Sequence, residues 1–313
     1  KMKKAAKIVL AAGAASAVLG SVLCVTAGSM IYKNIDRYNE KRHLTKIEYT
    51  APEEITAIKT NLSADDVDIM TGDVENVEMT YWEREDGEKY IVKVNEGVLS
   101  ISRNEDFSVN WEFNLPGFTN ERKISIVVPE DSDIAYTLKG SSGSIKMADV
   151  STSSDLTVKA TSGFISLDNV TSKGSVVCEM SSGLSDFNSI SCNNLSYKAS
   201  SGELKVNDVD CEEEIYLEQT SGLMIGDDLS CNSLKAKGTS GEMILKNVES
   251  KDINIEGTSG DIQLTLPDSK ENYNAIFNMT SGYCNESSVN NPDAEKNLSI
   301  KMTSGNINVK YAE

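Results

Sequence analysis

The chain has 313 residues and a formal net charge of −18. Because its first 32 residues hold four lysines and no acid, the remainder is more acidic still, with 26 basic and 48 acidic residues. A body of that charge repels nucleic acid and anionic lipid, which leaves cations, basic proteins and neutral glycans as partners. Only 6% of the residues are aromatic, and small polar residues are frequent, so the composition favours many short strands and turns over a helical bundle.

The first predicted element is a transmembrane helix at residues 8–32, after a short basic tail at residues 1–7. Ile8–Tyr32 contains no charged residue. A helix of that length spans about 37 Å, against about 30 Å of bilayer hydrocarbon, whereas the apolar core of a secretory signal has only about 7–15 residues. We therefore expect a retained single-pass anchor in the cell membrane, with the N-terminus cytoplasmic and the C-terminal body extracellular. The alternative is a signal peptide cleaved at Val25–Ala27.

The next segment, residues 33–54, has mixed charges and predicts a juxtamembrane stalk. It contains His43, the single histidine of the chain, so a His-based catalytic triad or a multi-histidine metal site is excluded by count. None of the six cysteines belongs to a Cys-x-x-Cys motif, which excludes a zinc ribbon or a thioredoxin-type site. The sequence therefore predicts no catalytic, cofactor-binding or metal-binding residues.

Residues 55–313 predict one extracellular domain of β-strands, and its first part, residues 55–133, is irregular. Apolar residues alternate with polar ones from Ile55 onward, which is the period of a half-buried strand. Thr71-Gly72 resembles a degenerate copy of a motif that becomes regular further along the chain.

Two further elements are expected before the regular part begins. Tyr90–Ser102 predicts a β-hairpin with its turn at Asn95–Gly97. Lys123–Val128 predicts another strand, which Pro129 ends.

Between these two elements lies the densest aromatic cluster of the body, formed by Trp111, Phe113 and Phe118. Exposed aromatic side chains stack on sugars and anchor interfaces, so this cluster is the best candidate for contact with a ligand or partner. The alternative, which we favour, is a hydrophobic plug that closes the open first rung.

A Ser/Thr-Ser-Gly tripeptide organises the rest of the chain. Its copies are 19 to 23 residues apart, and a period of about 20 over nine copies is the signature of a solenoid. The regular repeats occupy residues 134–267 and the capping rungs residues 268–313. Each glycine suits a corner that needs a positive φ. The nine glycines are Gly143, Gly163, Gly183, Gly202, Gly222, Gly241, Gly260, Gly282 and Gly305.

Apolar residues recur two, four and seven positions after each glycine, and a second alternating group precedes the next glycine. Each repeat is therefore expected to form two short strands separated by turns. One such unit cannot bury its apolar face alone, but units stacked about 4.8 Å apart pair their backbones and align equivalent side chains in columns. The predicted fold class is all-β: a single-stranded β-helix with rungs of about 20 residues.

One column of this alignment is rich in cysteine. Nine positions after the glycine stand Thr152, Ser172, Cys192, Cys211, Cys231, Ser250 and Ser269. Consecutive rungs place neighbouring Cα atoms about 4.8 Å apart, within the range of a disulfide. A column that requires small side chains explains the same residues without any redox role. If this column faces the core, the three thiols point inward and are buried as small apolar groups.

A second column is rich in aspartate and asparagine. Six positions after the glycine stand Asp149, Asn169, Ser189, Asp208, Asp228 and Asn247. Asp208 and Asp228 are expected one rung apart and could share a calcium ion. Nothing here resembles the glycine-rich aspartate repeats that bind calcium in other β-rolls, and we interpret the column as turn chemistry at a corner.

The end of the chain is less regular. Residues 285–297 form a polar insert that lengthens the penultimate repeat. Asn306–Tyr311 is predicted as the terminal strand and, unless it is capped, as an exposed edge.

The segment at residues 8–32, the opening Asp65–Ile69 followed by Thr71–Asp73, and the nine glycine repeats together cover most of the chain. In these features the chain resembles the bacterial putative-adhesin family, membrane-anchored β-strand repeat proteins of unknown function. Some members are similar to proteins encoded beside envelope-stress signalling systems. The resemblance implies a fold and a location, and it carries no functional residues.

Three hypotheses for function follow. The first is a membrane-anchored adhesin or envelope-binding module without catalysis or cofactor, whose partner is an envelope polymer, a host glycan or a protein. The second is an accessory protein of envelope-stress sensing that acts through a membrane partner packed against Gly13, Gly20 and Gly28. The third is a polysaccharide-acting enzyme, which we disfavour because Asp208 and Asp228 share one corner and the basic residues are scattered.

Overall fold

The computed structural model describes residues 44–84, 89–103 and 122–312. The chain divides into two compact units, Lys1–Thr45 with Arg84–Gly87 and Lys46–Glu83 with Glu88–Glu313, and the strands described below belong almost entirely to the second unit. The predicted anchor at residues 8–32 lies outside the described residues. Within the described ranges, no helix is long and apolar enough to cross a membrane.

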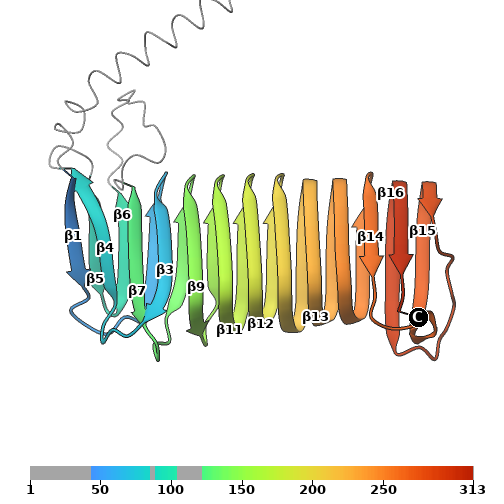
Figure 1. The fold of residues 1–313 in the computed structure, drawn as a ribbon, viewed down its shortest axis with the longest axis horizontal. Helices are drawn as coiled ribbons and strands as arrows, with labels where there is room; N and C mark the ends of the chain where they lie inside the picture. The colour runs from blue at the N-terminus through green and yellow to red at the C-terminus, as the bar shows by residue number, and fades with distance from the viewer. Residues whose placement is uncertain (1–43, 85–88, 104–121, 313) are drawn as a thin grey trace, which may run out of the picture. The chain divides into compact units, whose positions relative to one another are not determined.

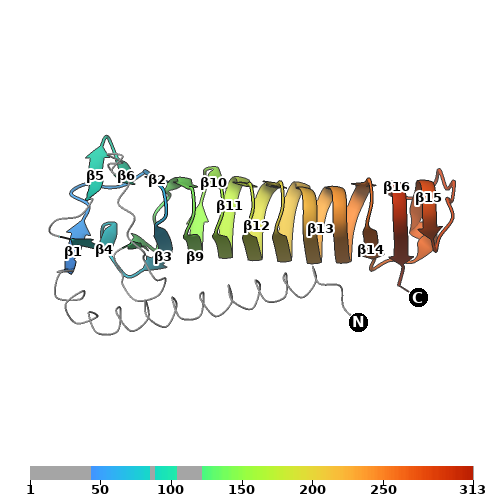
Figure 2. The same ribbon diagram turned by 90° about the horizontal axis from the view of Figure 1, so that it is seen from above.

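The described chain is all-β, as predicted, and its strands form one 16-stranded sheet that coils into a solenoid (Figures 1 and 2). The one described helix is the short 3-10 helix η1, Lys270–Asn272. The strands are β1 (Leu44–Thr50), β2 (Ala57–Leu62), β3 (Asp66–Gly72), β4 (Glu78–Arg84), β5 (Tyr90–Asn95), β6 (Val98–Arg103), β7 (Lys123–Pro129), β8 (Ala135–Gly140), β9 (Ser144–Thr152), β10 (Leu156–Ala160), β11 (Phe164–Met180), β12 (Leu184–Ala199), β13 (Glu203–Gly257), β14 (Asp261–Thr265), β15 (Tyr273–Cys284) and β16 (Lys296–Lys310).

The repeat after Gly143 shows how one rung is built. Three short segments, residues 144–148, 150–152 and 156–160, turn alternate side chains inward, and we call their equivalents in every rung faces A, B and C. The sequence predicted two strands per repeat, and the segment after Asp149 forms the additional face B. The inward residues of this rung are Ile145, Met147, Val150, Thr152, Leu156 and Val158. The predicted apolar columns are thereby confirmed as the core.

The corner between faces C and A requires glycine. Gly202 has a φ of 122°, and a Cβ at this position would lie 2.0 Å from the carbonyl oxygen of Gly183 in the neighbouring rung. A side chain is therefore excluded both by the backbone conformation and by the close approach of two backbones. The prediction of a positive-φ corner is confirmed.

The corner between faces A and B uses the aspartate- and asparagine-rich column. All six of its residues have φ between 47° and 57°, the left-handed region that asparagine and aspartate enter more readily than most residues. Their side chains also bond along the stack: Asn169 Nδ2 donates to Asp149 Oδ1 at 2.6 Å, and Ser189 Oγ donates to Asp208 Oδ2 at 2.8 Å. The interpretation as turn chemistry is confirmed.

At the N-terminal end, the order of rungs in the stack differs from their order in the sequence. β2 pairs in parallel with β6 on one side and β8 on the other. In the same way, β3 lies between β7 and β9 (Figure 1). We call β2 with β3 the N-terminal inner rung, and β6 with β7 the N-terminal outer rung. β5 and β4 then flank the outer rung in the antiparallel direction. The predicted hairpin is β5–β6, and its turn residues Glu96 and Gly97 have positive φ.

At the C-terminal end, too, the order of the last two rungs in the stack is the reverse of their order in the sequence. β16 pairs with β13 and β14 on one side and with β15 on the other, so β16 is the C-terminal inner rung and β15 the C-terminal outer rung (Figure 1). Asn306–Tyr311, predicted as the terminal strand and as an exposed edge unless capped, forms the last part of β16 as far as Lys310, and β15 covers this strand on its outer side. The polar insert instead covers part of β15, where Ala275 and Val289 exchange backbone hydrogen bonds of 3.0 and 2.8 Å.

Three other predictions need correction or comment. Val67 pairs with Ile145, so Thr71-Gly72 lies beside the Asp149 corner and is not a copy of the glycine corner. Ser269 was predicted to belong to the cysteine-rich column, and it does not. It lies directly before η1, in the connection that leads from β14 to the C-terminal outer rung β15. β1 lies within the segment expected as a stalk.

Candidate binding surface

The outward side of face C carries a ladder of alternating charges. Lys159 is in register with Glu179, Glu179 with Lys198, and Lys198 with Glu218. The spacing continues to Glu256, which is in register with Lys301. We call this column the charge ladder; it consists of Lys139, Lys159, Glu179, Lys198, Glu218, Lys237, Glu256 and Lys301.

Ion pairs form along the ladder, with 2.8 Å between Lys159 Nζ and Glu179 Oε2 and 3.3 Å between Lys237 Nζ and Glu256 Oε2. All four side chains are more than 40% exposed, so each pair contributes only about 0–1 kcal/mol to stability. The alternation begins at Lys159, because Lys139 and Lys159 are in register and place two like charges opposite each other.

An aromatic ring flanks the ladder, because Tyr216 lies two residues before Glu218 on the same strand. Tyr216 Oη donates a hydrogen bond of 2.7 Å to Glu218 Oε2, and Lys198 Nζ lies 5.3 Å from the centre of the Tyr216 ring. The hydrogen bond to Glu218, together with burial, raises the pKa of Tyr216 to about 12. The phenol therefore stays protonated at neutral pH, and its partly exposed ring lies between a cation and a carboxylate.

A row of hydroxyls runs parallel to the ladder at the edge of face C, formed by Thr161, Ser181, Ser200, Thr220, Thr239, Thr258 and Thr303. Between the ladder and this row the side chains are mostly short, as at Ala160, Ala199 and Gly238. Two shallow grooves result, of about 700 Å³ and about 330 Å³, and they share Glu218 and Thr220. Together they form one polar trough along the stack, which we call the face C trough.

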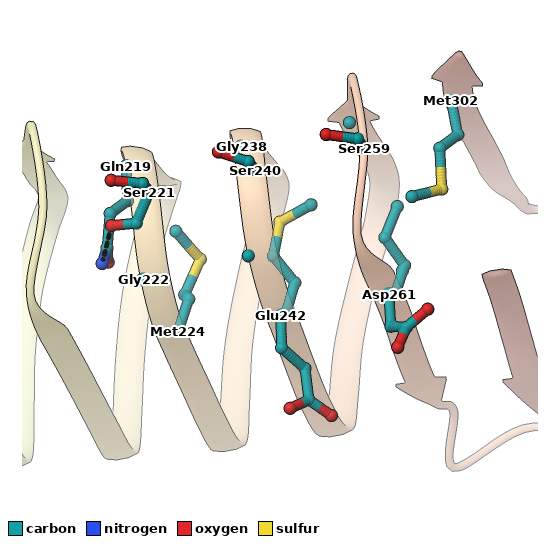
Figure 3. A pocket seen from close by; sticks show the side chains of 14 residues that line it. Gln219, Ser221, Gly222, Met224, Gly238, Ser240, Glu242, Ser259, Asp261 and Met302 are labelled. Carbon is teal, nitrogen blue, oxygen red and sulfur yellow. Dashed lines mark hydrogen bonds between the residues drawn. The ribbon is translucent and has the colours of Figure 1, made fainter. Parts of the chain in front are cut away.

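A small cavity beneath the glycine corner is not a ligand site. It measures about 10 Å³, room for about one water molecule. Figure 3 shows Met224 and Met302 along it, with the Gln219 side chain bonded beside Ser221. Gln219 Nε2 donates to the carbonyl oxygens of Gly202 and Ser221 at 2.7 and 2.8 Å. This buried amide therefore supports the corner.

A groove of about 530 Å³ on the outward side of face A is a weaker candidate. Its amides bond to one another along the stack: Asn188 Nδ2 donates to Asp168 Oδ1 at 2.7 Å, and Asn207 Nδ2 donates to Asn188 Oδ1 at 2.8 Å. These hydrogen bonds between rungs stabilise the stack. Fewer amide N–H groups therefore remain to bind a ligand in this groove.

The most buried charged cluster lies at the N-terminal end. The Asp65 carboxylate accepts a hydrogen bond of 2.7 Å from Tyr90 Oη and lies 3.5 Å from Arg103 Nη2. The Arg103 guanidinium also lies 4.4 Å from the centre of the Tyr90 ring. Because both charged side chains are at least 96% buried, the cluster ties the corner before β3 to the β5–β6 hairpin.

The sequence-predicted candidates fare differently. Trp111, Phe113 and Phe118 lie outside the described residues, so their role stays a prediction. Among the described residues, no group of three or more His, Cys, Asp or Glu side chains is placed to hold a metal ion.

The charge ladder was missed from the sequence, where the basic residues looked scattered. That view is wrong for face C, because lysine and glutamate alternate there from Lys159 to Glu256 at intervals of 19 or 20 residues. Aligning the repeats by their polar positions as well as their apolar ones would have revealed it.

Three solved structures are similar to this chain. One is a putative cell adhesion protein from Clostridium sporogenes, 14% identical with a TM-score of 0.30, covering 86% of this chain and 100% of its own. A putative adhesin from Bacteroides fragilis is 15% identical with a TM-score of 0.40, covering 85% and 96%. A putative adhesin from Parabacteroides distasonis is 12% identical with a TM-score of 0.31, covering 86% and 98%.

Among curated proteins, none matches this chain. The Toastrack DUF4097 family, by contrast, matches residues 55–310, which include all of the strands from β2 to β16. The match spans both inner rungs, both outer rungs and the regular repeats between them. The chain therefore belongs to the Toastrack DUF4097 family.

Proposed function

We propose that this protein is an adhesin-like binding module of the cell surface, without catalysis, which holds a linear polar polymer along the face C trough. The observation that carries the proposal is the trough itself, where a row of hydroxyls faces the charge ladder along the stack. The favoured ligand is an envelope or host glycan.

The chemistry of the trough suits such a ligand. Hydroxyl and carboxylate groups bond to sugar hydroxyls, and the Tyr216 ring beside the ladder adds an aromatic surface next to the trough. Because a hydroxyl recurs at every rung and a carboxylate at every second rung, a polymer can make many weak contacts in series, and their effective concentration raises the total affinity. A net charge of −18 disfavours nucleic acid.

The location is part of the proposal. The uncharged segment Ile8–Tyr32 supports a single-pass anchor, with residues 1–7 cytoplasmic, residues 33–54 beside the membrane and residues 55–313 outside the cell. Anchored in this way, the face C trough is presented to polymers of the envelope or of a host surface.

Binding of the full-length chain, reconstituted in lipid nanodiscs, to immobilised neutral and acidic polysaccharides tests the proposal. We expect Glu218→Ala to weaken binding about tenfold or more, because Glu218 lines both grooves of the trough. Lys205→Gln is the matched control, since its side chain lies on face A in an exposed pair with Glu203. That substitution is expected to leave binding unchanged.

Three results would contradict the proposal. If Glu218→Ala binds every glycan as tightly as the unmodified chain, the trough is not the site. If no polymer binds and crosslinking in membranes recovers only a membrane protein, the chain acts as an accessory of sensing. Release of shortened polysaccharide would instead identify an enzyme.

A further inference from the structure

Three cysteines of one inward column lie in successive rungs on face B. Cys192, Cys211 and Cys231 are 4%, 2% and 9% exposed, so the inward orientation considered from the sequence is confirmed. In other rungs the same column holds hydroxyls, such as Ser172, which donates to the Ser154 carbonyl oxygen at 2.8 Å. Serine therefore fits this column of the core as well as cysteine does. The need for a small side chain does not explain why three successive rungs carry a thiol.

The geometry singles out one pair of these thiols. Cys192 and Cys211 are in register on adjacent parallel strands, and their Sγ atoms are 3.1 Å apart. Adjacent strands hold such Cα atoms about 4.8 Å apart, inside the range of about 4.4–6.8 Å found in disulfides. The two sulfur atoms can therefore bond with side-chain adjustment alone.

We propose that Cys192 and Cys211 form a disulfide between neighbouring rungs, which closes residues 192–211 into a covalent ring one rung long. The thiolate of one cysteine attacks an external disulfide, such as oxidised glutathione, and displaces one thiol. The second cysteine then attacks the mixed disulfide and displaces the other thiol. The two cysteines lose two electrons and two protons, and the external disulfide is reduced to two thiols.

Cys231 and Cys178 are the competing partners, and their surroundings disfavour them. The Cys231 thiol hydrogen-bonds with Ser250 and with the backbone of Ile215, while Cys178 belongs to an inward column of face C. Cys231 therefore stays a thiol whose bonds are satisfied within its own surroundings.

Burial also sets when the bond forms. The hydrogen bond to Cys192 and burial raise the pKa of Cys211, so the reactive thiolate is scarce in the folded chain. The disulfide therefore forms while the rung is still open during folding, and the finished core then shields it from reductants. In the cell this requires an oxidising compartment, which the proposed extracellular location supplies, whereas the test in solution is independent of it.

The full-length chain is unfolded, reduced and refolded with either oxidised glutathione or a reductant, and all free thiols are then blocked with N-ethylmaleimide in denaturant, which exposes the buried cysteines. Trypsin alone leaves Cys211 and Cys231 on one peptide, because no lysine or arginine lies between Lys205 and Lys235. A glutamate-specific protease is therefore added, and peptides are assigned by mass spectrometry.

We expect a crosslinked pair containing Cys192 and Cys211, with Cys178 and Cys231 alkylated. Oxidised glutathione added to the already folded, reduced chain is expected to form the crosslink at least about tenfold more slowly. Oxidative refolding should raise the denaturant midpoint of the unmodified chain and of Cys231→Ala, the matched control, but not of Cys192→Ala or Cys211→Ala.

The mapping on the unmodified chain does not depend on any variant folding. Recovery of both Cys192 and Cys211 in alkylated form after oxidative refolding would overturn the proposal. A crosslink between Cys211 and Cys231, or between Cys178 and Cys192, would do the same.

Discussion

The regular middle of the solenoid and its two ends are built on different principles. In the middle, each rung pairs with the rungs before and after it in the sequence, as β11 does with β9 and β12. At each end, the order of two rungs in the stack is the reverse of their order in the sequence. The rung of β2 and β3 lies between the rung of β6 and β7 and that of β8 and β9, and β16 lies between β15 and the strands β13 and β14. Periodicity specifies the middle, whereas the ends depend on individual contacts.

The contacts at the two ends are of the same kind. The connection from β7 to β8 must step over the N-terminal inner rung, and Asp133 within it accepts a 2.7 Å hydrogen bond from the Ser153 backbone N–H. The connection from β14 to β15 steps over the C-terminal inner rung, and Asp268 within it accepts hydrogen bonds from Lys296 and from Tyr273 Oη. Each step is thus held by one aspartate.

The largest expected effect tests the middle. Gly202→Ala places a Cβ 2.0 Å from the Gly183 carbonyl oxygen at a φ of 122°, and we expect a loss of about 4 kcal/mol or more of unfolding free energy. Denaturant unfolding followed by circular dichroism measures it. Gly238→Ala is the matched control, since its Cβ would meet Met243 at an ordinary 3.4 Å and its φ is not positive. Equal losses from both substitutions would show that the corner does not depend on backbone contact.

The N-terminal end is tested by its buried ion pair. Asp65→Asn keeps the shape of the side chain but removes the buried carboxylate charge that faces Arg103 and accepts the hydrogen bond of Tyr90, and we expect a loss of about 3 kcal/mol. The control is Asp68→Asn, which removes the half-exposed 2.9 Å pair with Lys123 between the same two rungs and should cost at most about 1 kcal/mol. If the two substitutions cost the same, the buried cluster does not hold the end.

The C-terminal end is tested by pH. The hydrogen bond from Lys296 holds the pKa of Asp268 below its ordinary value. A carboxyl with a lowered pKa stabilises the fold above its unfolded pKa of about 3.9, and that stabilisation is lost as the pH falls through the folded pKa. Asp268→Asn should therefore cost about 1 kcal/mol at pH 7 and nearly nothing at the acid end of the transition.

Unfolding of the Asp268→Asn variant and the unmodified chain at a series of pH values measures this difference. A cost that does not change with pH would indicate a purely steric role. The hydrogen bonds from Ser153 lower the pKa of Asp133 in the same direction, so Asp133→Asn should show the same sign of pH dependence, with a smaller size because this carboxyl is exposed.

The smallest expected effect concerns the charge ladder. Glu179→Lys puts a third positive charge beside Lys159 and Lys198, and we expect a loss of about 0.5–1 kcal/mol that shrinks at high salt. The second substitution Lys159→Glu restores an opposite pair and should recover part of the loss in a double-mutant cycle. Strict additivity of the two substitutions would mean that the ladder pairs do not interact.

Much of the middle follows from the sequence, because burial repeats with the period. The columns that contain Ile145, Met147 and Val150 are apolar in nearly every copy, and a column of glycine marks the corner. Face B was merged with its neighbour in the prediction of two strands per repeat, although the spacing of three residues between the inward Met147 and Val150 marks the corner at Asp149. Gly226 interrupts the apolar column that contains Met147. The side chain of Leu229 explains this, because it lies 2.8 Å from where a Cβ of residue 226 would be.

The reversed ends could not be read from the period, because the period says which residues are equivalent and not which rungs are neighbours. Leu298 repeats the pattern of Ala275, yet it pairs with both Ala275 and Ile253. The trace of the reversal in the sequence is the lengthening of the glycine intervals to 22 and 23 residues around Gly282. The charge ladder escaped notice because it depends on polar positions, which vary freely in a solenoid without disturbing the core.

The inner rungs have a mechanical consequence. β2 lies near the start of the solenoid chain and β16 at its end, and both have paired neighbours on both sides. At the N-terminal side, tension first reaches the edge strand β1, which has β4 as its neighbour. Beyond β1 it must shear β2 from β6 and β8 together, and at the other end it must shear β16 from β15 and β13 together. A solenoid whose ends are held in this way resists pulling at its two inner rungs.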